Sequence, residues 1–453
     1  MNTAAPPRAR AHPVLGSALD LRRDQIGTYE RVMRELGDVV RLVIGPPGLR
    51  FELYCLFHPD GVKAVLAGSR EGYSKGNRFY QQVAEAFGWG LLTSEGELWQ
   101  RQRRLIQPLF TRRQIATYAD LMAEETAAVA DRWELAVRNG GAVDANAEMV
   151  QLALRVVGRA IFGADTTKAS AVLDSSFAVL NRHTFRRATS PLTIPPSWPT
   201  PDNRRAQRAR RALYAVVDEL IARRGRDDVD GADLLSRLLA ARNPETGAVM
   251  DVQQVRDEAL IFLLAGHETT STALTFTLHL LARHPSEQRL VQDEIDAVLD
   301  GRPPTFDDTP ALTRTAMAIK EAIRLYPPAY ALGRQVESDQ EISGYMIRAG
   351  STVLVSQFAT HRHPQFWEDA DAFQPARFTA EREAARHRYA YFPFGGGPRA
   401  CIGSHFAMLE ATIAVALLLQ RFQIHSEQKA VSLDSAGITL RPAGAVPLRL
   451  TTR

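Results

Sequence analysis

Cys401 stands where a cysteine is suited to nucleophilic chemistry or to holding a metal. It follows the glycines of the run 395–397 and precedes a stretch in which Phe406, Leu409 and Ile413 recur at helical spacing. A glycine turn can point several backbone N–H groups at the sulfur, and the start of a helix adds its positive end. Both effects lower the pKa of a thiol. The sequence therefore predicts a thiolate here rather than an inert, packed cysteine.

A second candidate site interrupts the longest helical stretch, residues 252–284. Positions 265–270 read Ala-Gly-His-Glu-Thr-Thr, and glycine and threonine are poor residues for a helix interior. One interpretation is a kink in which a threonine hydroxyl bonds to the carbonyl four residues earlier. The other is a local opening that turns Thr269 and Glu268 toward a cavity, with Gly266 admitting a ligand. The spacing alone favours neither.

Two further pairs of residues are weak signals by themselves. Trp99 and Arg103 stand four residues apart, so an indole N–H and a cation share one helix face and could hold one carboxylate. Glu321 and Arg324 have the spacing of an ordinary ion pair within a helix. Such pairs usually belong to solvated helix faces, so spacing gives them little weight.

Length and composition allow one large domain or two moderate ones. The chain has 453 residues, 45% of them hydrophobic, and a net charge of +4, which is too small to indicate nucleic-acid binding. Only Cys55 and Cys401 are present, too few for a disulfide framework, which indicates a reducing compartment. The N-terminal residues contain no apolar segment, and no apolar run approaches the length of a membrane span. We therefore expect a cytoplasmic protein without a membrane anchor.

The elements that must position these residues are mainly helices. Apolar residues at helical spacing predict helices over 24–36, 118–137, 148–162 and 204–224. Alternating and β-branched residues predict strands over 39–44, 51–57, 340–347 and 352–358. The fold class is therefore predicted to be α with a small β region.

Four segments read as irregular or terminal structure. Residues 1–12 are expected to be flexible, and 74–89 to form an irregular loop that could line a pocket. Residues 438–440 and 446–450 are expected to close the chain as a hairpin. The proline-rich run 190–203 separates stretches of similar helical texture, so we interpret it as a lid loop within a single domain, 1–453, rather than as a linker.

Taken in their order along the chain, these stretches resemble a cytochrome P450 over essentially the whole length. The cysteine turn is similar to that family's F-x-x-G-x-R-x-C-x-G signature, here Phe394, Gly397, Arg399, Cys401 and Gly403. Residues 265–270 resemble the family's oxygen-activating helix segment. The weaker motifs resemble its W-x-x-x-R, its E-x-x-R and the arginine that completes that cluster, here Trp99 with Arg103, Glu321 with Arg324, and Arg377.

The resemblance implies a fold, a cofactor and the residues that hold the cofactor. The fold would be a mainly helical triangular prism, and Cys401 would be the proximal thiolate ligand of haem b. Buried haem propionates need cationic or N–H partners. The residues implied in binding haem are Trp99, Arg103, Ala265, Arg334, Phe394, Arg399, Cys401 and Gly403, with Phe394 covering the sulfur. Glu321, Arg324 and Arg377 are implied as a structural ion-pair cluster.

The resemblance also implies catalytic and substrate-binding residues. Thr269 would orient a water chain and Glu268 would supply it with protons during O₂ activation. A substrate pocket of this family is expected to be mostly apolar. The pocket residues implied are Tyr80, Phe87, Phe262, Ala265, Gly266, Ala329, Tyr330 and Leu332.

The implied activity is a haem-thiolate monooxygenase that hydroxylates or epoxidises a hydrophobic small molecule. Arginine-rich and alanine-rich composition favours a bacterial source, and with it secondary metabolism. The motifs account for the whole chain, so no segment is left for a flavin or iron–sulfur region. A separate ferredoxin or flavodoxin with its reductase would therefore supply electrons. An oxidative cyclase or coupling enzyme that inserts no oxygen stays open. A non-catalytic haem sensor is disfavoured, because it would not need Glu268 and Thr269.

Overall fold

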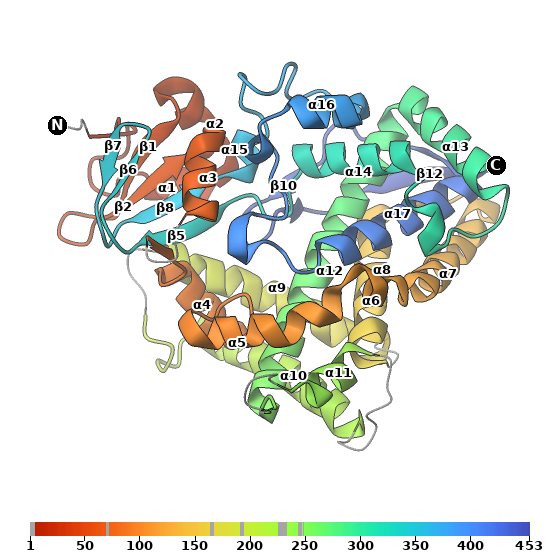
Figure 1. Cartoon of the computed structure of the whole chain (residues 1–453), viewed down its shortest axis with the longest axis horizontal. Coiled ribbons are helices and arrows are strands. Elements are labelled where there is room, and N and C mark those ends of the chain that lie inside the picture. The colour runs from red at the N-terminus through yellow and green to blue at the C-terminus, as the bar shows by residue number, and fades with distance from the viewer. Residues whose placement is uncertain are drawn as a thin grey trace.

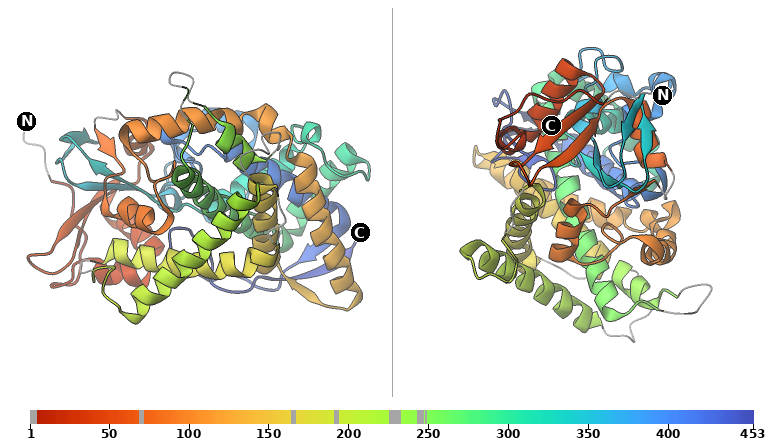
Figure 2. Two further views of the ribbon diagram at one scale, coloured as in Figure 1. Left: turned by 90° about the horizontal axis from the view of Figure 1, so that it is seen from below. Right: turned by 90° about the vertical axis from the view of Figure 1, so that its left-hand side faces the viewer.

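The computed structural model describes residues 5–68, 72–163, 167–190, 194–224, 233–242, 247 and 249–453. A β region with α1 to α3 lies at one side, and the other helices form the rest of the body (Figure 1). The chain begins at the β side and ends at the opposite side (Figure 1). The second view of Figure 2 looks onto this β region and shows helices behind it. The predicted mainly α fold with a small β region is confirmed.

Helices account for most of the described chain, and their apolar faces build the core. α2 illustrates the local logic: the Asp24 side chain accepts the Gly27 N–H at 2.9 Å at its start, which satisfies one of the unpaired N–H groups of the first turn. The helices are α1 (Ala18–Arg23), α2 (Gln25–Leu36), α3 (Pro59–Ala67), α4 (Arg78–Phe87), α5 (Gly96–Ile106), α6 (Arg112–Ala116), α7 (Ala119–Arg138), α8 (Ala145–Phe162), α9 (Thr167–Thr189), α10 (Pro201–Arg224), α11 (Leu234–Ala240), α12 (Val252–Arg283), α13 (Pro285–Leu299), α14 (Thr313–Leu325), α15 (Gln357–Thr360), α16 (Ala380–Ala385) and α17 (Ser404–Arg421).

α12 is the central element of the helical part. It packs against α8, α10, α14 and α17, and it runs through the middle of the molecule (Figure 1). Most of its residues are buried on all sides, as expected for a helix surrounded by other helices. None of the described helices is long and apolar enough to cross a membrane.

The strands form one mixed sheet and three smaller ones. The largest has the order β1-β2-β8-β5-β3, with β2 parallel to β8 and the other pairs antiparallel. The strands are β1 (Val39–Ile44), β2 (Phe51–Leu56), β3 (Tyr73–Ser74), β4 (Ala142–Asp144), β5 (Leu332–Val336), β6 (Gln340–Ile342), β7 (Tyr345–Ile347), β8 (Thr352–Val355), β9 (Phe422–His425), β10 (Leu433–Asp434), β11 (Arg441–Pro442) and β12 (Pro447–Thr452). β6 and β7 pair only with each other, so of the two later predicted strand regions only 352–358 joins the sheet of β1.

The predicted irregular loop over 74–89 is wrong for most of its length, because α4 occupies Arg78–Phe87. Asn77 caps this helix by accepting the Tyr80 N–H at 3.2 Å. Tyr80, Val83 and Phe87 recur at helical spacing and are buried. The glycines on both sides concealed this periodicity in the sequence.

The two ends of the chain also differ from expectation. Residues 1–4 lie outside the described chain, but Pro7 and Ala9 exchange backbone hydrogen bonds with Arg41 of β1, so residues 7–9 are paired rather than flexible. At the other end, β12 pairs with β4 and β9. Residues 438–440 form no strand, so the predicted closing hairpin is wrong. β12 therefore pairs with strands that are distant in the sequence and not with the nearby residues 438–440.

Candidate active site

The turn that carries Cys401 is closed by its own backbone. The Cys401 N–H donates to the Phe394 carbonyl at 2.9 Å, and α17 begins at Ser404, three residues after the cysteine. Gly397 has a φ of 63°, and a Cβ there would lie 2.0 Å from the Leu66 carbonyl oxygen of α3. Only glycine fits such a position. The turn therefore packs closely against α3 at Gly397.

The pKa of Cys401 shifts in the opposite direction to the one that the sequence predicted. Burial raises the pKa of the Cys401 thiol above its ordinary value, while the Gly403 N–H and the Arg103 guanidinium oppose that rise only in part. The side chain nevertheless has exposed surface. The protein alone thus favours the thiol, and a bound cation would be needed to hold the sulfur as thiolate.

A cluster of cations lies on one side of this turn. The Arg399 guanidinium stacks over the Trp99 ring at 4.0 Å, donates to the Ser94 carbonyl at 2.8 Å and pairs with Glu95 at 2.8 Å. Arg334, on β5, is buried and donates to its neighbour's carbonyl and, at 3.3 Å, to the Tyr80 hydroxyl. Residues far apart in sequence thus converge beside the cysteine turn.

Lys75 belongs to the same cluster, although the sequence did not single it out. Its ammonium donates to the Leu92 carbonyl at 2.6 Å and lies 4.7 Å from the Tyr80 ring centre. Burial, and then the charges of Arg334 and Arg399, hold the pKa of Lys75 well below its usual value. The chain has only five lysines, and no pattern in the polar sequence around Lys75 marked it as a site residue.

This cluster fits a ligand that brings two carboxylates. Lys75 and Arg334 are buried, and neither forms an ion pair with any residue that the structure describes. The one acid in the cluster, Glu95, is taken up by Arg399. Buried cations are costly without anionic partners. A cavity of about 170 Å³ opens here, lined by Trp99, Arg334, Arg399 and Glu95 among others, so the residues present fit haem propionates.

Arg103 links the cations to the cysteine turn. Its guanidinium donates to the Ala400 carbonyl at 3.3 Å, next to Cys401, and it is half-buried. Phe394 and Gly403 flank the same turn and are half-buried as well. A larger surface groove of about 420 Å³, at Arg421 and Arg453, contains none of the predicted site residues. Its two arginines are already paired with acids, so we assign it no role in the chemistry.

One face of α12 is open in the middle of an otherwise buried helix. Ala265 is exposed, and Gly266 and Thr269 are half-buried. The helix continues through this stretch, and the Thr269 hydroxyl donates to the Ala265 carbonyl at 2.5 Å. The back-bonded threonine of the first interpretation is therefore present, and the helix has no break over 265–270. Phe262, one turn earlier, packs in the same hydrophobic cluster as Ile402, the neighbour of Cys401.

Glu268 does not face the open side of α12. Its carboxylate is buried and accepts hydrogen bonds from Asn181 Nδ2 at 2.8 Å and from the Thr439 hydroxyl at 2.6 Å. Arg441 lies 3.9 Å away. Asn181 comes from α9, while Thr439 and Arg441 come from the turn around β11. No sequence motif marked these partners, because they meet Glu268 only through the tertiary fold.

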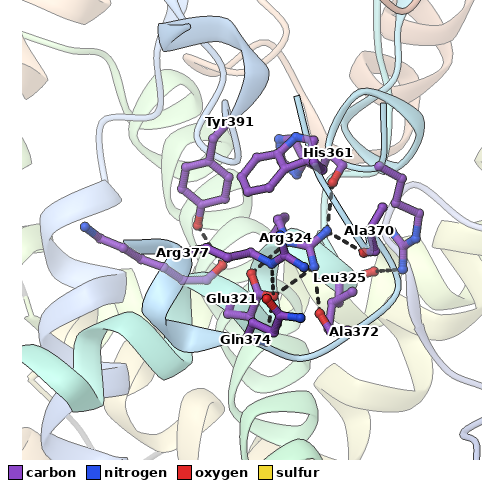
Figure 3. A network of polar contacts seen from close by, with 12 residues as sticks. Glu321, Arg324, Leu325, His361, Ala370, Ala372, Gln374, Arg377 and Tyr391 are labelled. Atoms are coloured by element: carbon purple, nitrogen blue, oxygen red, sulfur yellow. Dashed lines mark hydrogen bonds and ion pairs between the residues drawn. The ribbon is translucent and has the colours of Figure 1, made fainter. Parts of the chain in front are cut away.

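Glu321, Arg324 and Arg377 meet in a buried cluster (Figure 3). Arg324 pairs with Glu321 at 2.7 Å, and Arg377 Nε lies 3.3 Å from the same carboxylate. Arg324 also donates to the carbonyls of His361, Ala370 and Ala372 at 2.7–3.1 Å. The donors that reach these carbonyls clamp α14 to the loop after α15, while the others bond to Glu321 within α14.

The residues predicted to line a substrate pocket have different surroundings in the structure. Ala265, Gly266, Ala329 and Leu332 keep exposed or half-buried surface. Phe87 is fully buried and stacks on Phe177, with the ring centres 6.0 Å apart. The buried Tyr330 hydroxyl donates to the Ser435 and Gly437 carbonyls. Tyr80 lies with the cations.

Comparison with known proteins points to the same conclusion as this geometry. A family model described as cytochrome P450 matches residues 6–446. Pentalenene oxygenase of Streptomyces avermitilis is 35% identical over 444 residues, covering 98% of this chain and 96% of that protein. Cyclooctat-9-en-7-ol 5-monooxygenase of Streptomyces melanosporofaciens is 36% identical over 415 residues, covering 91% of this chain and 88% of that protein.

A solved structure shares the whole fold. The crystal structure of the cytochrome P450DA heme domain has a TM-score of 0.89 and 28% sequence identity, and the match covers 100% of this chain and 98% of that one. The cysteine turn, the cations beside it and the open face of α12 thus occur in a chain that matches the family along nearly its full length. The chain belongs to the cytochrome P450 family of haem monooxygenases.

Proposed function

We propose that this monooxygenase hydroxylates or epoxidises a terpene-like substrate in bacterial secondary metabolism. The relatives named above are called an oxygenase of pentalenene and a monooxygenase of cyclooctat-9-en-7-ol, an alkene and an alkenol by name. The observation that carries the proposal is the rigid Cys401 turn, which borders the same hydrophobic cluster as the open face of α12. An apolar molecule at that face would lie next to the group bound by Cys401.

In this proposal Cys401 would hold haem b through its sulfur, and the bound haem would supply an iron that activates O₂. Lys75, Arg103, Arg334 and Arg399 would hold the propionates, with Trp99 stacked on Arg399. The carboxylates would give the two buried cations the anionic partners that they lack among the described residues. Phe394 and Gly403 would support the sulfur from the turn.

Thr269 and Glu268 would move protons on the substrate side. The Thr269 hydroxyl uses its hydrogen on the Ala265 carbonyl, so its oxygen lone pairs can accept from a water and orient it. Glu268 is held by Asn181 and Thr439, and it would have to exchange these donors for water to pass a proton toward Thr269. We propose the pair as catalytic on this basis.

Separate proteins would complete the cycle. A ferredoxin or flavodoxin with its reductase would supply electrons, O₂ would be the oxidant, and the cytoplasm would be the compartment. Glu321, Arg324 and Arg377 would be structural, because their cluster is buried and Arg324 bonds to backbone carbonyls.

The first test is the spectrum of the reduced, carbon-monoxide-bound protein. Thiolate ligation by Cys401 predicts the Soret band typical of cysteine-ligated haem, and Cys401→Ser should abolish it. Conversion of an apolar terpene under labelled dioxygen should then place one labelled oxygen atom in the product. A product without label would assign the chain to oxidative cyclisation or coupling instead.

The proton-delivery roles have a matched control on the same helix. Thr277 also donates its hydroxyl to the carbonyl four residues earlier, at 2.7 Å, and it is fully buried. Thr269→Ala should raise electron consumption without a matching rise in product. Thr277→Ala should leave the ratio of product formed to electrons consumed unchanged. Equal coupling in Thr269→Ala and the wild type would remove Thr269 from the mechanism.

A further inference from the structure

Two arginines from different helices meet where α4 packs against α9 (Figure 1). Arg187, near the end of α9, donates from Nε to the Gln82 side-chain oxygen of α4 at 2.5 Å and from a terminal nitrogen to the Ile194 carbonyl at 2.7 Å. Arg78 is the first residue of α4 and stands one helical turn before Gln82, so both side chains lie on the same face of that helix. Burial, and then the charge of Arg187, lowers the pKa of Arg78. The two guanidinium groups are therefore neighbours.

These two cations have little negative charge to balance them. The Arg187 side chain is only 12% exposed, and its acidic partner among the described residues, Glu85, lies 3.9 Å away and is itself 54% exposed. Arg78 is half-buried and has neither a hydrogen bond nor an ion pair with any residue that the structure describes. A guanidinium that is partly withdrawn from water is costly without an anion beside it. The pair therefore keeps positive charge for an anion that the described chain does not supply.

Other arginines on this part of α9 have acids of their own. Arg186 pairs with Asp202, and Arg182 lies 3.8 Å from Asp434. Arg78 is less exposed than either of these arginines. A fully solvated arginine needs no partner, whereas Arg78 combines partial burial with a like charge beside it.

A free hydroxyl lies on the same side of α9. Thr184 stands one turn before Arg187, so the two side chains share a face of the helix. The Thr184 hydroxyl is buried and has no hydrogen-bond partner among the described residues. Thr189, on the same helix, instead donates to the carbonyl four residues earlier at 2.9 Å. Thr184 therefore keeps a donor for a ligand, which is a second and independent sign of a polar group bound here.

We propose that Arg78 and Arg187 bind a carboxylate of the substrate, with the Thr184 hydroxyl as a neutral donor beside them. This inference rests on the proposed function, because it narrows the terpene-like substrate to one that bears an acid. Each guanidinium can offer a carboxylate a pair of parallel N–H donors. A hydrocarbon at this position would exclude water from both charges without pairing them, which disfavours it.

The position of Arg187 also indicates which end of the substrate reacts. Asn181, which donates to Glu268, lies six residues before Arg187 on α9, and six residues of helix span roughly 9 Å. A carboxylate at Arg187 is therefore separated by about that length from the part of α12 that carries Glu268 and Thr269. Oxidation should fall on carbons that are remote from the acid.

Equilibrium dialysis of the full-length holoprotein tests the site, since it measures binding whether or not the haem spectrum shifts. The probes are two pairs of acid and methyl ester at neutral pH, farnesoic acid with methyl farnesoate and abietic acid with methyl abietate. The acid of at least one pair should bind about tenfold more tightly than its ester, or better. Arg78→Gln should remove this preference and leave ester binding unchanged. Arg22→Gln, at an exposed arginine of α1, should bind as the wild type.

Thermal unfolding without ligand separates a binding role of Arg78 from a structural one. Arg78→Gln loses no hydrogen bond to a described residue and removes a charge beside Arg187, so its melting temperature should equal or exceed that of the wild type. A lower melting temperature would make Arg78 a structural residue and overturn its assignment. Arg78→Lys keeps the charge but not the paired donors, so it should recover part of the preference for the acid.

Three other results would overturn the proposal. The first is that neither acid binds more tightly than its ester. The second is an undiminished preference for the acid in Arg78→Gln. The third is oxidation of a bound acid at the carbon next to its carboxylate. Acid binding that depends on Arg78, in a protein that oxidises neither acid, would support the site and count against the proposed function instead.

Discussion

Replacing Glu258 by glutamine is expected to remove one source of pH dependence from the stability of this protein. Glu258, on α12, is fully buried, and its Oε2 accepts the Leu91 N–H at 2.9 Å. Its Oε1 has no hydrogen-bond partner among the described residues. The adjacent Asp257 accepts the Trp89 N–H at 2.8 Å. Two neighbouring acids thus fasten the segment 88–94 to the central helix.

The magnitude follows from the pKa of Glu258. Burial raises this pKa from 4.5 to about 8, while the Leu91 N–H opposes the rise and Asp257 adds to it. Because the folded protein binds the proton more tightly than the unfolded chain, the contribution to stability is complete below the unfolded pKa. This contribution falls as the pH rises from the unfolded pKa to about 8. Above that pH the ionisation of Glu258 no longer changes the stability. The loss between pH 6 and pH 9 is about 2–3 kcal/mol.

Urea unfolding at pH 6 and at pH 9 measures this difference. Glu258→Gln cannot ionise, and its amide oxygen can still accept the Leu91 N–H, so the fall in unfolding free energy between the two pH values should shrink by about 2–3 kcal/mol. Glu97→Gln, on the exposed face of α5, should keep the dependence of the wild type. An undiminished fall in Glu258→Gln would refute the reasoning, since Glu258 would then titrate as an exposed acid.

Three further outcomes follow from the site. Lys75→Met should speed transfer of haem to apomyoglobin at least about tenfold, because a charged hydrogen bond to a propionate is lost; unchanged transfer would place Lys75 outside the haem site. Arg324→Ala should lower the free energy of unfolding by about 3–5 kcal/mol, because it leaves a buried carboxylate with reduced pairing, and the exposed, paired Arg348→Ala should change urea unfolding little. Gly397→Ala should lose haem and the carbon-monoxide band, because its Cβ meets a carbonyl of α3, whereas Gly444→Ala meets nothing within 4 Å and should retain both.

Long helices and buried strands were predictable, because their signals are local. α2, α8 and α12 follow apolar periodicity within a few residues of the predicted bounds. β1 and β2 follow from β-branched residues around a glycine and proline turn. α4 was missed because its helical face is short and flanked by glycines. The pairing of β12 was missed because strand partners are chosen by the fold and not by proximity in sequence.

The cysteine turn was predictable in geometry, but the direction of the pKa shift of Cys401 was not. Glycine at 395 and 397 predicted the turn, and the structure has positive φ at both. The predicted lowering of the Cys401 pKa failed, because burial of the sulfur outweighs the N–H of Gly403 and the charge of Arg103. Burial is a property of the whole fold, which no local motif reports.

The sequence by itself determined the order of motifs, and with it the family and the central position of Cys401, because each motif is a short run of residues whose spacing is fixed by the chain. Only the tertiary structure decided which side chains meet. It brought Lys75 to Arg334 and Arg399, turned the Tyr330 hydroxyl toward the Gly437 carbonyl, and enclosed Glu268 between Asn181 and Thr439. These contacts join distant segments, so they depend on packing and desolvation, which act on the folded chain as a whole.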